Sequence, residues 1–389
     1  MASNRIVLSG SYGTRNVGDE AILTVLVNEL GARGFGVDVL TFTPEATSAR
    51  QPAANAVRSG VLRGSLATFN AIRNADAIVI GGGGILQDAT SLRNLLFHVS
   101  RPIMAAMTGT PVVISGVGVG PLRHALSRRL TRWVCDRAAS IDVRDQRSAN
   151  LLETLGVPAD KLKNGADFAH LLPRNNRDAM CSGGRTVIES LAAAREQGRP
   201  LIGLSLRPPV GNRSRRARLS DTDRADIETM ARIADRIIDE HDAHIVFVSM
   251  YAEQDDPIAE LLAGAMRHYD GVLPVSGGLP PATIKAAIAE LDLMIGTRLH
   301  TLIFAACENV PFVALAYDDK VAAYAEVLGL TSLVLDRPEW TVDAVCEHVT
   351  ATLVAAAEIR QQLAEGVPRC TERARQSIDR ICTAARGEC

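Results

Sequence analysis

The sequence predicts an α/β protein made of two Rossmann-like, doubly wound domains. Apolar, strand-like runs alternate with helix-like stretches, and runs such as AIVI (residues 77–80) and PVVIS (residues 111–115) are apolar at consecutive positions. Such runs are typical of parallel strands that helices cover on both faces. The length of 389 residues also exceeds that of one ordinary domain. We therefore expect two domains that face each other across a cleft, with ligands at the carboxyl ends of the strands.

The composition limits the class of protein. Hydrophobic residues make up 47% of the chain and charged residues 22%, and the net charge is −2, so no overall basic field favours a nucleic-acid partner. No run is apolar for long enough to span a membrane, and no signal peptide precedes the first strand-like run. The seven cysteines show no CxxC spacing, which is typical of reduced thiols. We expect a soluble, cytoplasmic protein.

The order of the strand-like runs predicts where the domains divide. A first series occupies residues 5–9, 37–42, 77–80, 112–115 and 140–143, with a weaker run at 162–166, and a second series (LIGLSL, HIVFVSM, LMIGT, FVALAY and SLVLD) begins after Pro200. Helix-like patterns occupy residues 186–197, 342–364 and 372–385. We expect a first domain over residues 1–175, a linker with one helix over 176–199, a second domain over 200–370, and a C-terminal helix over 371–389, with packing back on the first domain as one option.

The stretch GSYGTRNVGDEAIL (residues 10–23) joins the first strand to the first helix. Its glycines, Gly13 and Gly18 among them, allow backbone amides to approach a ligand, and the positive end of the next helix, near Asp19, favours anions. The stretch matches neither the GxGxxG nor the Walker pattern. Two interpretations stay open: a loop that contacts a ligand, or a turn in which Asp19 only caps the helix.

Four consecutive glycines follow the apolar run at residues 77–80, in the stretch GGGGILQD (residues 81–88). One interpretation is a backbone cradle for a ligand, with Gln87 and Asp88 as polar contacts. The alternative is a sharp turn that allows close helix packing.

A later strand end, SIDVRDQRS (residues 140–148), carries Arg144 beside Asp145. An arginine at the carboxyl end of a strand lies where ligands bind in this fold, and its planar guanidinium suits a carboxylate or a phosphate. A surface ion pair between Arg144 and Asp145 is the alternative.

The segment at residues 291–320 places three chemically active side chains at two adjacent strand ends. The run LMI leads into Arg298 and His300, and the run FVALAY leads to Lys320. An imidazole can both give and take a proton near neutrality, and the two cations suit an anionic ligand. A lone histidine at a helix start is more often structural, but its cationic neighbours favour a functional role here.

These motifs, in this order and at these separations, resemble the polysaccharide pyruvyl transferase family. GSYGTRNVGDEAIL, GGGGILQD, VRDQRS, GTRLHTLIFAA and PFVALAYDDKV carry the resemblance, which spans residues 6–330. It implies a GT-B-like fold with an interdomain active site. It also implies a reaction that moves the enolpyruvyl unit of phosphoenolpyruvate onto two hydroxyls of one sugar, giving a pyruvate ketal and phosphate. We expect phosphoenolpyruvate as co-substrate, no cofactor, and no metal, since no Asp/His set has metal-ligand spacing.

The resemblance also implies roles for the candidate residues. Arg144, Arg298 and Lys320 would bind the anionic groups of the donor, with Leu299 beside them. His300 would protonate the methylene carbon as general acid. The first domain would receive a saccharide acceptor through Gly13, Asn16, Gly18, Asp19, Gly83, Gly84, Gln87 and Asp88, with Asp19 or Asp88 as the base.

Two stretches depart from the family pattern. GADFAHLL (residues 165–172) approximates an Asp-Pro-x-Phe turn but lacks the proline, and we assign it no site residue. RSRRAR (residues 213–218) adds a basic cluster, either as a solvated loop or as a contact with a diphosphate-linked acceptor or an anionic membrane surface. Whether the acceptor is lipid-linked, nucleotide-linked or a small metabolite stays open, as do peripheral membrane contact and a homo-oligomer.

Two other functions fit the same fold. A nucleotide-sugar glycosyltransferase would also need cations, in its case for a diphosphate. A non-catalytic saccharide- or nucleotide-binding protein could retain the fold without the chemistry, because fold alone does not establish activity.

Overall fold

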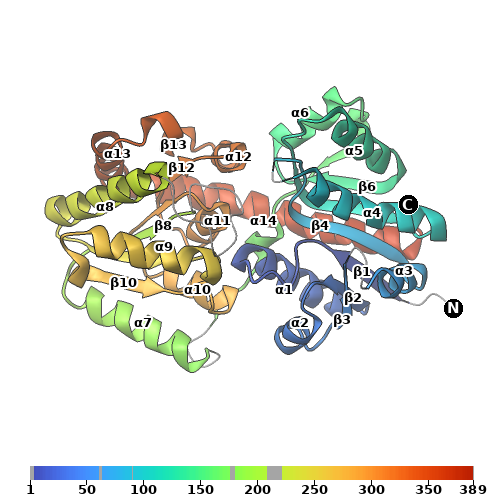
Figure 1. Cartoon of the computed structure of the whole chain (residues 1–389), viewed down its shortest axis with the longest axis horizontal. Coiled ribbons are helices and arrows are strands. Elements are labelled where there is room, and N and C mark those ends of the chain that lie inside the picture. Colours follow the sequence, from blue (N-terminus) through green and yellow to red (C-terminus); the bar gives the residue numbers. More distant parts are fainter. Residues whose placement is uncertain (1–3, 61–63, 90, 176–179, 208–220, 389) are drawn as a thin grey trace. The chain divides into compact units, whose positions relative to one another are not determined.

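Figure 1 shows the computed structural model of the protein, which describes residues 4–60, 64–89, 91–175, 180–207 and 221–388. The arginine-rich stretch RSRRAR that the sequence singled out lies outside these residues. The chain divides into two compact units. Unit 1 comprises Met1–Leu172 and Arg369–Cys389, and unit 2 comprises Pro173–Pro368.

The described part of unit 1 contains a seven-stranded parallel sheet with helices on both faces (Figure 1). In sheet order its strands are β3 (Asn55–Arg58), β2 (Gly36–Thr41), β1 (Arg5–Ser9), β4 (Ala77–Leu86), β5 (Val112–Val119), β6 (Ala138–Val143) and β7 (Leu162–Asn164). The helices are α1 (Val17–Ala32), α2 (Pro44–Arg50), α3 (Ser65–Arg73), α4 (Leu92–Thr108), α5 (Ala125–Arg137), α6 (Gln146–Thr154), the short 3-10 helix η2 (Phe168–Leu171) and the last part of α14 (Ala356–Arg386). Right-handed crossovers place α3, α4 and α5 on one face, where α4 packs against both neighbours.

Unit 2 contains a six-stranded parallel sheet of the same kind. Its strands, in sheet order, are β10 (Val272–Val275), β9 (His244–Val248), β8 (Leu201–Ser205), β11 (Leu293–Gly296), β12 (Phe312–Ala316) and β13 (Val334–Asp336). The helices are α7 (Ser182–Arg195), α8 (Asp221–His241), α9 (Ala252–Ala265), α10 (Pro281–Ile288), α11 (Leu299–Cys307), α12 (Asp319–Leu328), α13 (Val342–Val354) and the first part of α14.

The central strands are buried along their whole length, as their consecutive apolar residues require. All residues of β8, β9, β11 and β12 are buried, and these strands supply much of the core of unit 2. In unit 1 the corresponding core lies between the sheet and α4 and α5. The sequence prediction of an α/β fold with two doubly wound sheets is confirmed.

Several element boundaries differ from the sequence prediction. β4 does not end before the glycines but continues through them to Leu86, and β5 extends to Val119. The edge strands β3 and β10 were not predicted, because they are short and partly exposed and β10 contains Pro274. At the C-terminus the predicted helix at 342–364 divides into α13 and the start of α14. The predicted helix at 372–385 is the later part of the same long α14.

The predicted linker and C-terminal helix fall into different units. Residues 180–199 contribute α7 to unit 2, whereas α14 passes from unit 2 into unit 1 at Pro368. Within unit 1, Arg380 of α14 forms an ion pair with the fully buried Asp142 of β6, and the Ser377 hydroxyl donates to the same carboxylate at 3.3 Å. None of the helices in the described residues is both long and apolar enough to cross a lipid bilayer.

Helix α4 buries a titratable pair inside unit 1. His98 is 2% exposed and Arg101 is 3% exposed, and the Arg101 guanidinium donates to the Ser59 hydroxyl at 2.6 Å. Burial, assisted by the positive charge of Arg101, lowers the pKa of His98 to about 3. His98 is therefore neutral in the folded protein at any pH near neutrality.

We predict that His98 makes unit 1 sensitive to acid. The unfolded chain takes up a proton at His98 near pH 6.5, but the folded chain does so only near pH 3, so the stability that the neutral ring contributes is present above the unfolded pKa and is lost as the pH falls. The free energy of unfolding of the wild type should fall relative to that of His98→Gln by up to about 1.4 kcal/mol per pH unit in this window. Urea unfolding at several pH values measures the difference, and a difference that is flat between pH 7 and pH 4.5 would contradict the assignment.

Candidate functional site

In both units the sequence motifs lie at the point where the strand order reverses. In unit 1 this point lies between β1 and β4, and in unit 2 it lies between β8 and β11. In open parallel sheets the crevice at the carboxyl ends of such strands is where ligands bind. Each unit therefore has a candidate site of its own, and we describe the two separately.

The turn after β1 is held together by side chains of its own sequence. Asn16 caps α1, because its Oδ1 accepts hydrogen bonds from the backbone amides of Gly18 at 3.0 Å and of Asp19 at 3.5 Å. The Gly13 amide donates to Oε1 of Glu20 at 2.9 Å. The helix cap is thus Asn16 and not Asp19, which the sequence had offered as a capping residue.

The first two glycines of β4 allow close packing. The pairing of β1 with β4 ends at Ile80, so β4 extends beyond the end of β1 at these glycines. There the Tyr12 hydroxyl donates to the Gly81 carbonyl at 2.8 Å. A Cβ atom at Gly82 would lie 2.4 Å from Cγ2 of Ile22, and Gly82 has a φ of +67°. This half of the tract therefore matches the packing interpretation of the glycines.

The last two glycines of the tract have a different environment. A Cβ atom at Gly83 would lie 3.1 Å from Oδ1 of Asp19, so this glycine brings the strand backbone close to the Asp19 carboxylate. Gly84 is exposed, and a Cβ atom there would meet nothing within 4 Å. Gly83 itself is buried, so the accessible backbone of this half is that of Gly84, one residue beyond the contact with the carboxylate, as a cradle for a ligand requires.

The negative charges of three carboxylates act on the buried Tyr12 side chain. Burial, and then the charges of Asp19, Glu20 and Asp167, raise the pKa of Tyr12 far above its ordinary value. Burial also raises the pKa of Glu20, although the hydrogen bond from the Gly13 amide opposes the shift. Glu20 is 4% exposed and supports the turn, whereas Asp19 is only partly buried and is the carboxylate of the pair that solvent can reach.

Arg144 lies in unit 1 between two carboxylates. Its Nη1 donates to Oδ2 of Asp167 at 2.9 Å, its Nε lies 3.6 Å from Oδ2 of Asp145, and its side chain is 6% exposed. The guanidinium also packs on Gly118 of β5, where a Cβ atom would approach within 2.7 Å of Nη2. Asp167 comes from the stretch at residues 165–172, to which the sequence analysis assigned no site residue.

Asp88 is directed towards the segment that precedes α5. Its oxygens accept hydrogen bonds from the backbone amides of Arg123 at 2.8 Å and of His124 at 2.9 Å. Burial alone would raise the pKa of Asp88, but the hydrogen bonds from these backbone amides outweigh it and hold the pKa below the ordinary range. Gln87, next to it, is partly buried.

A cationic group that the sequence analysis missed lies at the carboxyl end of β8. Nη1 of Arg207 donates to the Tyr317 hydroxyl at 2.6 Å, and the Arg207 amide donates to the Thr297 hydroxyl at 2.7 Å. Nζ of Lys320 lies 5.4 Å from the centre of the same tyrosine ring and 3.1 Å from Oδ2 of Asp318. Arg207 follows its strand at the same kind of position as Arg144 and Arg298 do, so this signal was present in the sequence.

The positive charges of Arg207 and Lys320 shift the pKa values of two neighbouring side chains. Burial alone would raise the pKa values of Tyr317 and Asp318, but the positive charges of Lys320 and Arg207 outweigh it and hold both pKa values below their ordinary ranges. The carboxyl end of β12 therefore lies in a positive local field, which suits an anionic ligand.

Arg298 is held by a buried carboxylate. Its guanidinium forms an ion pair with Asp255, and the two side chains are 11% and 3% exposed. Asp255 also accepts hydrogen bonds from the backbone amides of Met250 at 3.0 Å and of Tyr251 at 3.1 Å, which ties Arg298 to the loop after β9. Arg298 is thus oriented by its partner before any ligand binds.

The residues after Arg298 open helix α11. Leu299 is buried, and His300 is the second residue of the helix and is partly exposed, with its Nε2 atom buried. The Arg298 side chain makes no capping hydrogen bond to α11, so the positive end of this helix is available to an anion. Unit 2 therefore brings together Arg207, Arg298, His300 and Lys320 at three neighbouring strand ends, whereas the predicted cation Arg144 belongs to unit 1.

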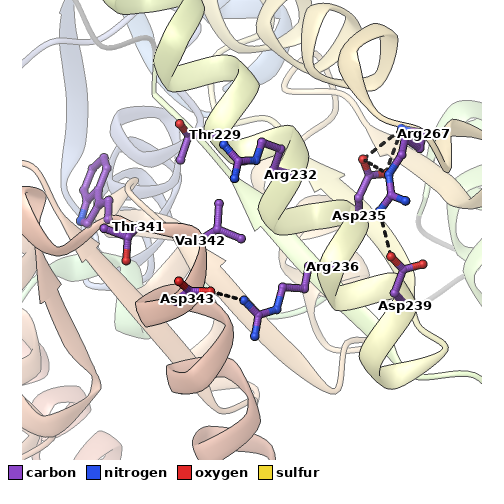
Figure 2. A pocket seen from close by; sticks show the side chains of 10 residues that line it. Thr229, Arg232, Asp235, Arg236, Asp239, Arg267, Thr341, Val342 and Asp343 are labelled. Atoms are coloured by element: carbon purple, nitrogen blue, oxygen red, sulfur yellow. Dashed lines mark hydrogen bonds and ion pairs between the residues drawn. The ribbon is translucent and has the colours of Figure 1, made fainter.

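A pocket of about 750 Å³ lies elsewhere in unit 2 (Figure 2). Helix α8, Arg267 and the start of α13 line it, and two of its three arginines, Arg236 and Arg267, are paired with aspartates. No residue of the candidate site lines this pocket. Among the residues that the structure describes, no group of three or more His, Cys, Asp or Glu side chains could hold a metal ion.

Comparisons with known proteins identify a family and a relative that this chain is similar to. The family described as polysaccharide pyruvyl transferase matches residues 16–319. The amylovoran biosynthesis protein AmsJ of Erwinia amylovora is 25% identical over 307 residues, which cover 76% of this chain and 70% of that protein.

Solved structures share the fold at low sequence identity. The UDP-GlcNAc 2-epimerase of Neisseria meningitidis superposes with a TM-score of 0.59 at 12% identity, over 97% of this chain and 99% of that one. A glycosyltransferase from Rickettsia africae gives a TM-score of 0.61 at 9% identity over 98% of each chain. The predicted GT-B-like fold is confirmed, and at these identities the likeness extends to the fold alone.

The contrast between two glycines of β4 can be tested. We predict that Gly82→Ala lowers the free energy of unfolding by about 2–4 kcal/mol, because it combines a left-handed backbone with a clash against Ile22. The matched variant Gly84→Ala, with open space at its Cβ, should change it by no more than about 0.5 kcal/mol. Urea unfolding of the two variants measures this, and equal costs would show that packing does not distinguish the two halves of the tract.

Proposed function

The chain belongs to the polysaccharide pyruvyl transferase family, and from that premise we propose that it transfers the enolpyruvyl group of phosphoenolpyruvate to a saccharide acceptor. Family membership makes it a transferase with a role in polysaccharide synthesis. In the proposed reaction the methylene carbon gains one proton, and two acceptor hydroxyls each lose a proton as their oxygens bond to the adjacent carbon. The bond from that carbon to the phosphate oxygen breaks, the second proton leaves with the phosphate, and a pyruvate ketal results.

We assign the donor to the strand ends of unit 2. Phosphoenolpyruvate carries a carboxylate and a phosphate, so its site needs at least two cations. The observation that supports this assignment is the group formed by Arg207, Arg298 and Lys320, together with the open positive end of α11. Since these groups can neutralise the donor, we propose that the reaction needs no resident cofactor.

We assign the proton that reaches the methylene carbon to His300. The ring follows Arg298 directly and lies in the first turn of α11, beside the cations that would hold the donor. Protonation of the methylene carbon leaves an oxocarbenium-like centre that a sugar hydroxyl attacks as phosphate departs. Tyr317 is the second candidate for the acid, because its pKa is lowered and Arg207 already donates to its oxygen.

We assign the acceptor to the strand ends of unit 1, with Asp19 as the base. Asp19 is partly exposed and lies beside Gly83, which immediately precedes the exposed Gly84. Asp88 suits this role less well, because backbone amides occupy its oxygens and its pKa is lowered. We assign Arg144 to the support of Asp167, since its guanidinium is enclosed.

Donor binding can be tested by calorimetric titration with phosphoenolpyruvate, UDP-glucose and UDP-N-acetylglucosamine. We predict saturable binding of phosphoenolpyruvate and about ten- to hundredfold weaker binding by Arg207→Ala or Lys320→Ala, since each loses a charged hydrogen bond. Arg232→Ala, an exposed arginine of the pocket in Figure 2, is the matched control and should bind as the wild type does.

Arg298→Ala is a poorer test, because it would leave the buried Asp255 without its cation and destabilise the unit. Binding of a UDP-sugar in the absence of phosphoenolpyruvate binding would overturn the proposal in favour of glycosyl transfer.

The acid can be tested separately from the donor site. We predict that His300→Ala lowers turnover by about 10²–10⁴-fold, because a positioned general acid contributes on that scale, while the Kd for phosphoenolpyruvate changes little. Phosphate release in the presence of saccharide acceptors measures turnover, and calorimetry measures the Kd. Tyr317→Phe is the matched variant. If it loses turnover and His300→Ala does not, the role of acid belongs to the phenol.

A further inference from the structure

The charge of unit 1 is unevenly distributed along the sequence. Residues 46–137, which end with α5, contain eleven arginines, no lysine, no glutamate and three aspartates, although the whole chain carries a net charge of −2. All three aspartates are engaged: Asp88 accepts the backbone amides before α5, Asp76 accepts the Arg5 amide at 2.7 Å, and Asp136 pairs with Arg132 at 2.7 Å. This part of unit 1 is therefore strongly basic.

Helix α4 in this region is apolar on two faces. Residues such as Leu95 and Val99 lie in the core, whereas Leu96, Ile103 and Met107 are 43%, 42% and 73% exposed. These three residues follow Arg93 at helical spacing, so all four share one stripe on the solvent side of the helix. An apolar stripe opposite the core face indicates a second binding partner for α4.

The two neighbours of α4 have the same arrangement. On α5, Leu126 is 49% exposed and shares a stripe with the exposed Arg129, and Arg137 stacks on Trp133 at 4.3 Å. On α3, Leu66 is 72% exposed. Of the nine large apolar side chains that are exposed in the described residues, five lie on these three helices. We call the solvent side of α3, α4 and α5 the α3–α5 surface.

We propose that the α3–α5 surface binds an anionic lipid bilayer. Arginines interleaved with exposed Leu, Ile and Met match a bilayer surface, where negative headgroups lie directly above an apolar layer. The arginines would contact lipid phosphates, and Leu96, Ile103 and Met107 would enter the interface between headgroups and acyl chains. The charge complementarity favours this partner, and the proposal does not depend on the assigned chemistry.

Flotation of the full-length protein with vesicles tests the proposal. We expect partition onto vesicles of phosphatidylglycerol and phosphatidylethanolamine that weakens as salt rises, and little partition onto phosphatidylcholine. Ile103→Ser/Met107→Ser should weaken it by at least about tenfold, and Arg93→Gln/Arg129→Gln by about fivefold for each arginine removed. These side chains are exposed, so the variants should fold, which circular dichroism checks.

Matched controls come from unit 2. Leu261→Ser/Val354→Ser and Arg224→Gln/Arg232→Gln remove exposed side chains of the same kinds and should leave partition unchanged. The proposal fails if the anionic vesicles bind no protein, or if the arginines of residues 213–218 account for the binding when they are replaced by glutamine. It also fails if sedimentation shows that the α3–α5 surface joins two copies of the chain and that Ile103→Ser/Met107→Ser only separates them.

Discussion

The candidate site of unit 1 depends on the contact between Tyr12 and the glycines of β4. With no side chains at Gly81 and Gly82, the tyrosine ring and the start of α1 can approach the strand backbone closely. That approach determines where the first turn of α1 lies, and therefore where Asp19 lies relative to Gly83. A cap by Asn16 and a buried Glu20 then hold the turn, so the polar residues at the start of the chain have separate tasks.

Unit 2 uses ion pairs for the same purpose, one buried and one partly exposed. Asp255 orients Arg298, and Asp318 lies against Lys320, so the cations are positioned by carboxylates that a ligand does not have to displace. Arg207 is instead oriented by a phenol, since its guanidinium donates to the Tyr317 hydroxyl, a neutral acceptor that does not cancel its charge. Because preorganised cations lose little freedom when an anion binds, this arrangement favours affinity for a small dianionic or trianionic ligand.

Much of the fold was predictable from the sequence because the central strands are buried on both faces and read as continuous apolar runs. Edge strands such as β3 and β10 were not, since half-exposed residues and Pro274 remove that signal. In the site, the strand-end residues Arg298, His300 and Lys320 could be placed by order alone. The roles of Asp88 and Asp167 could not, because each depends on an amide or a guanidinium that only the folded chain brings near. The cap by Asn16 is local and is typical of asparagine, since its partners are the amides of Gly18 and Asp19.

The course of α14 has a consequence for the order in which the units fold. Unit 2 is one continuous stretch of chain, whereas unit 1 is made of two segments that unit 2 separates. Asp142 acquires Arg380 and Ser377 only from the second of these segments. On a ribosome, unit 1 therefore stays unfinished until the whole of unit 2 has been translated, and until then its sheet contains a carboxylate without its cation.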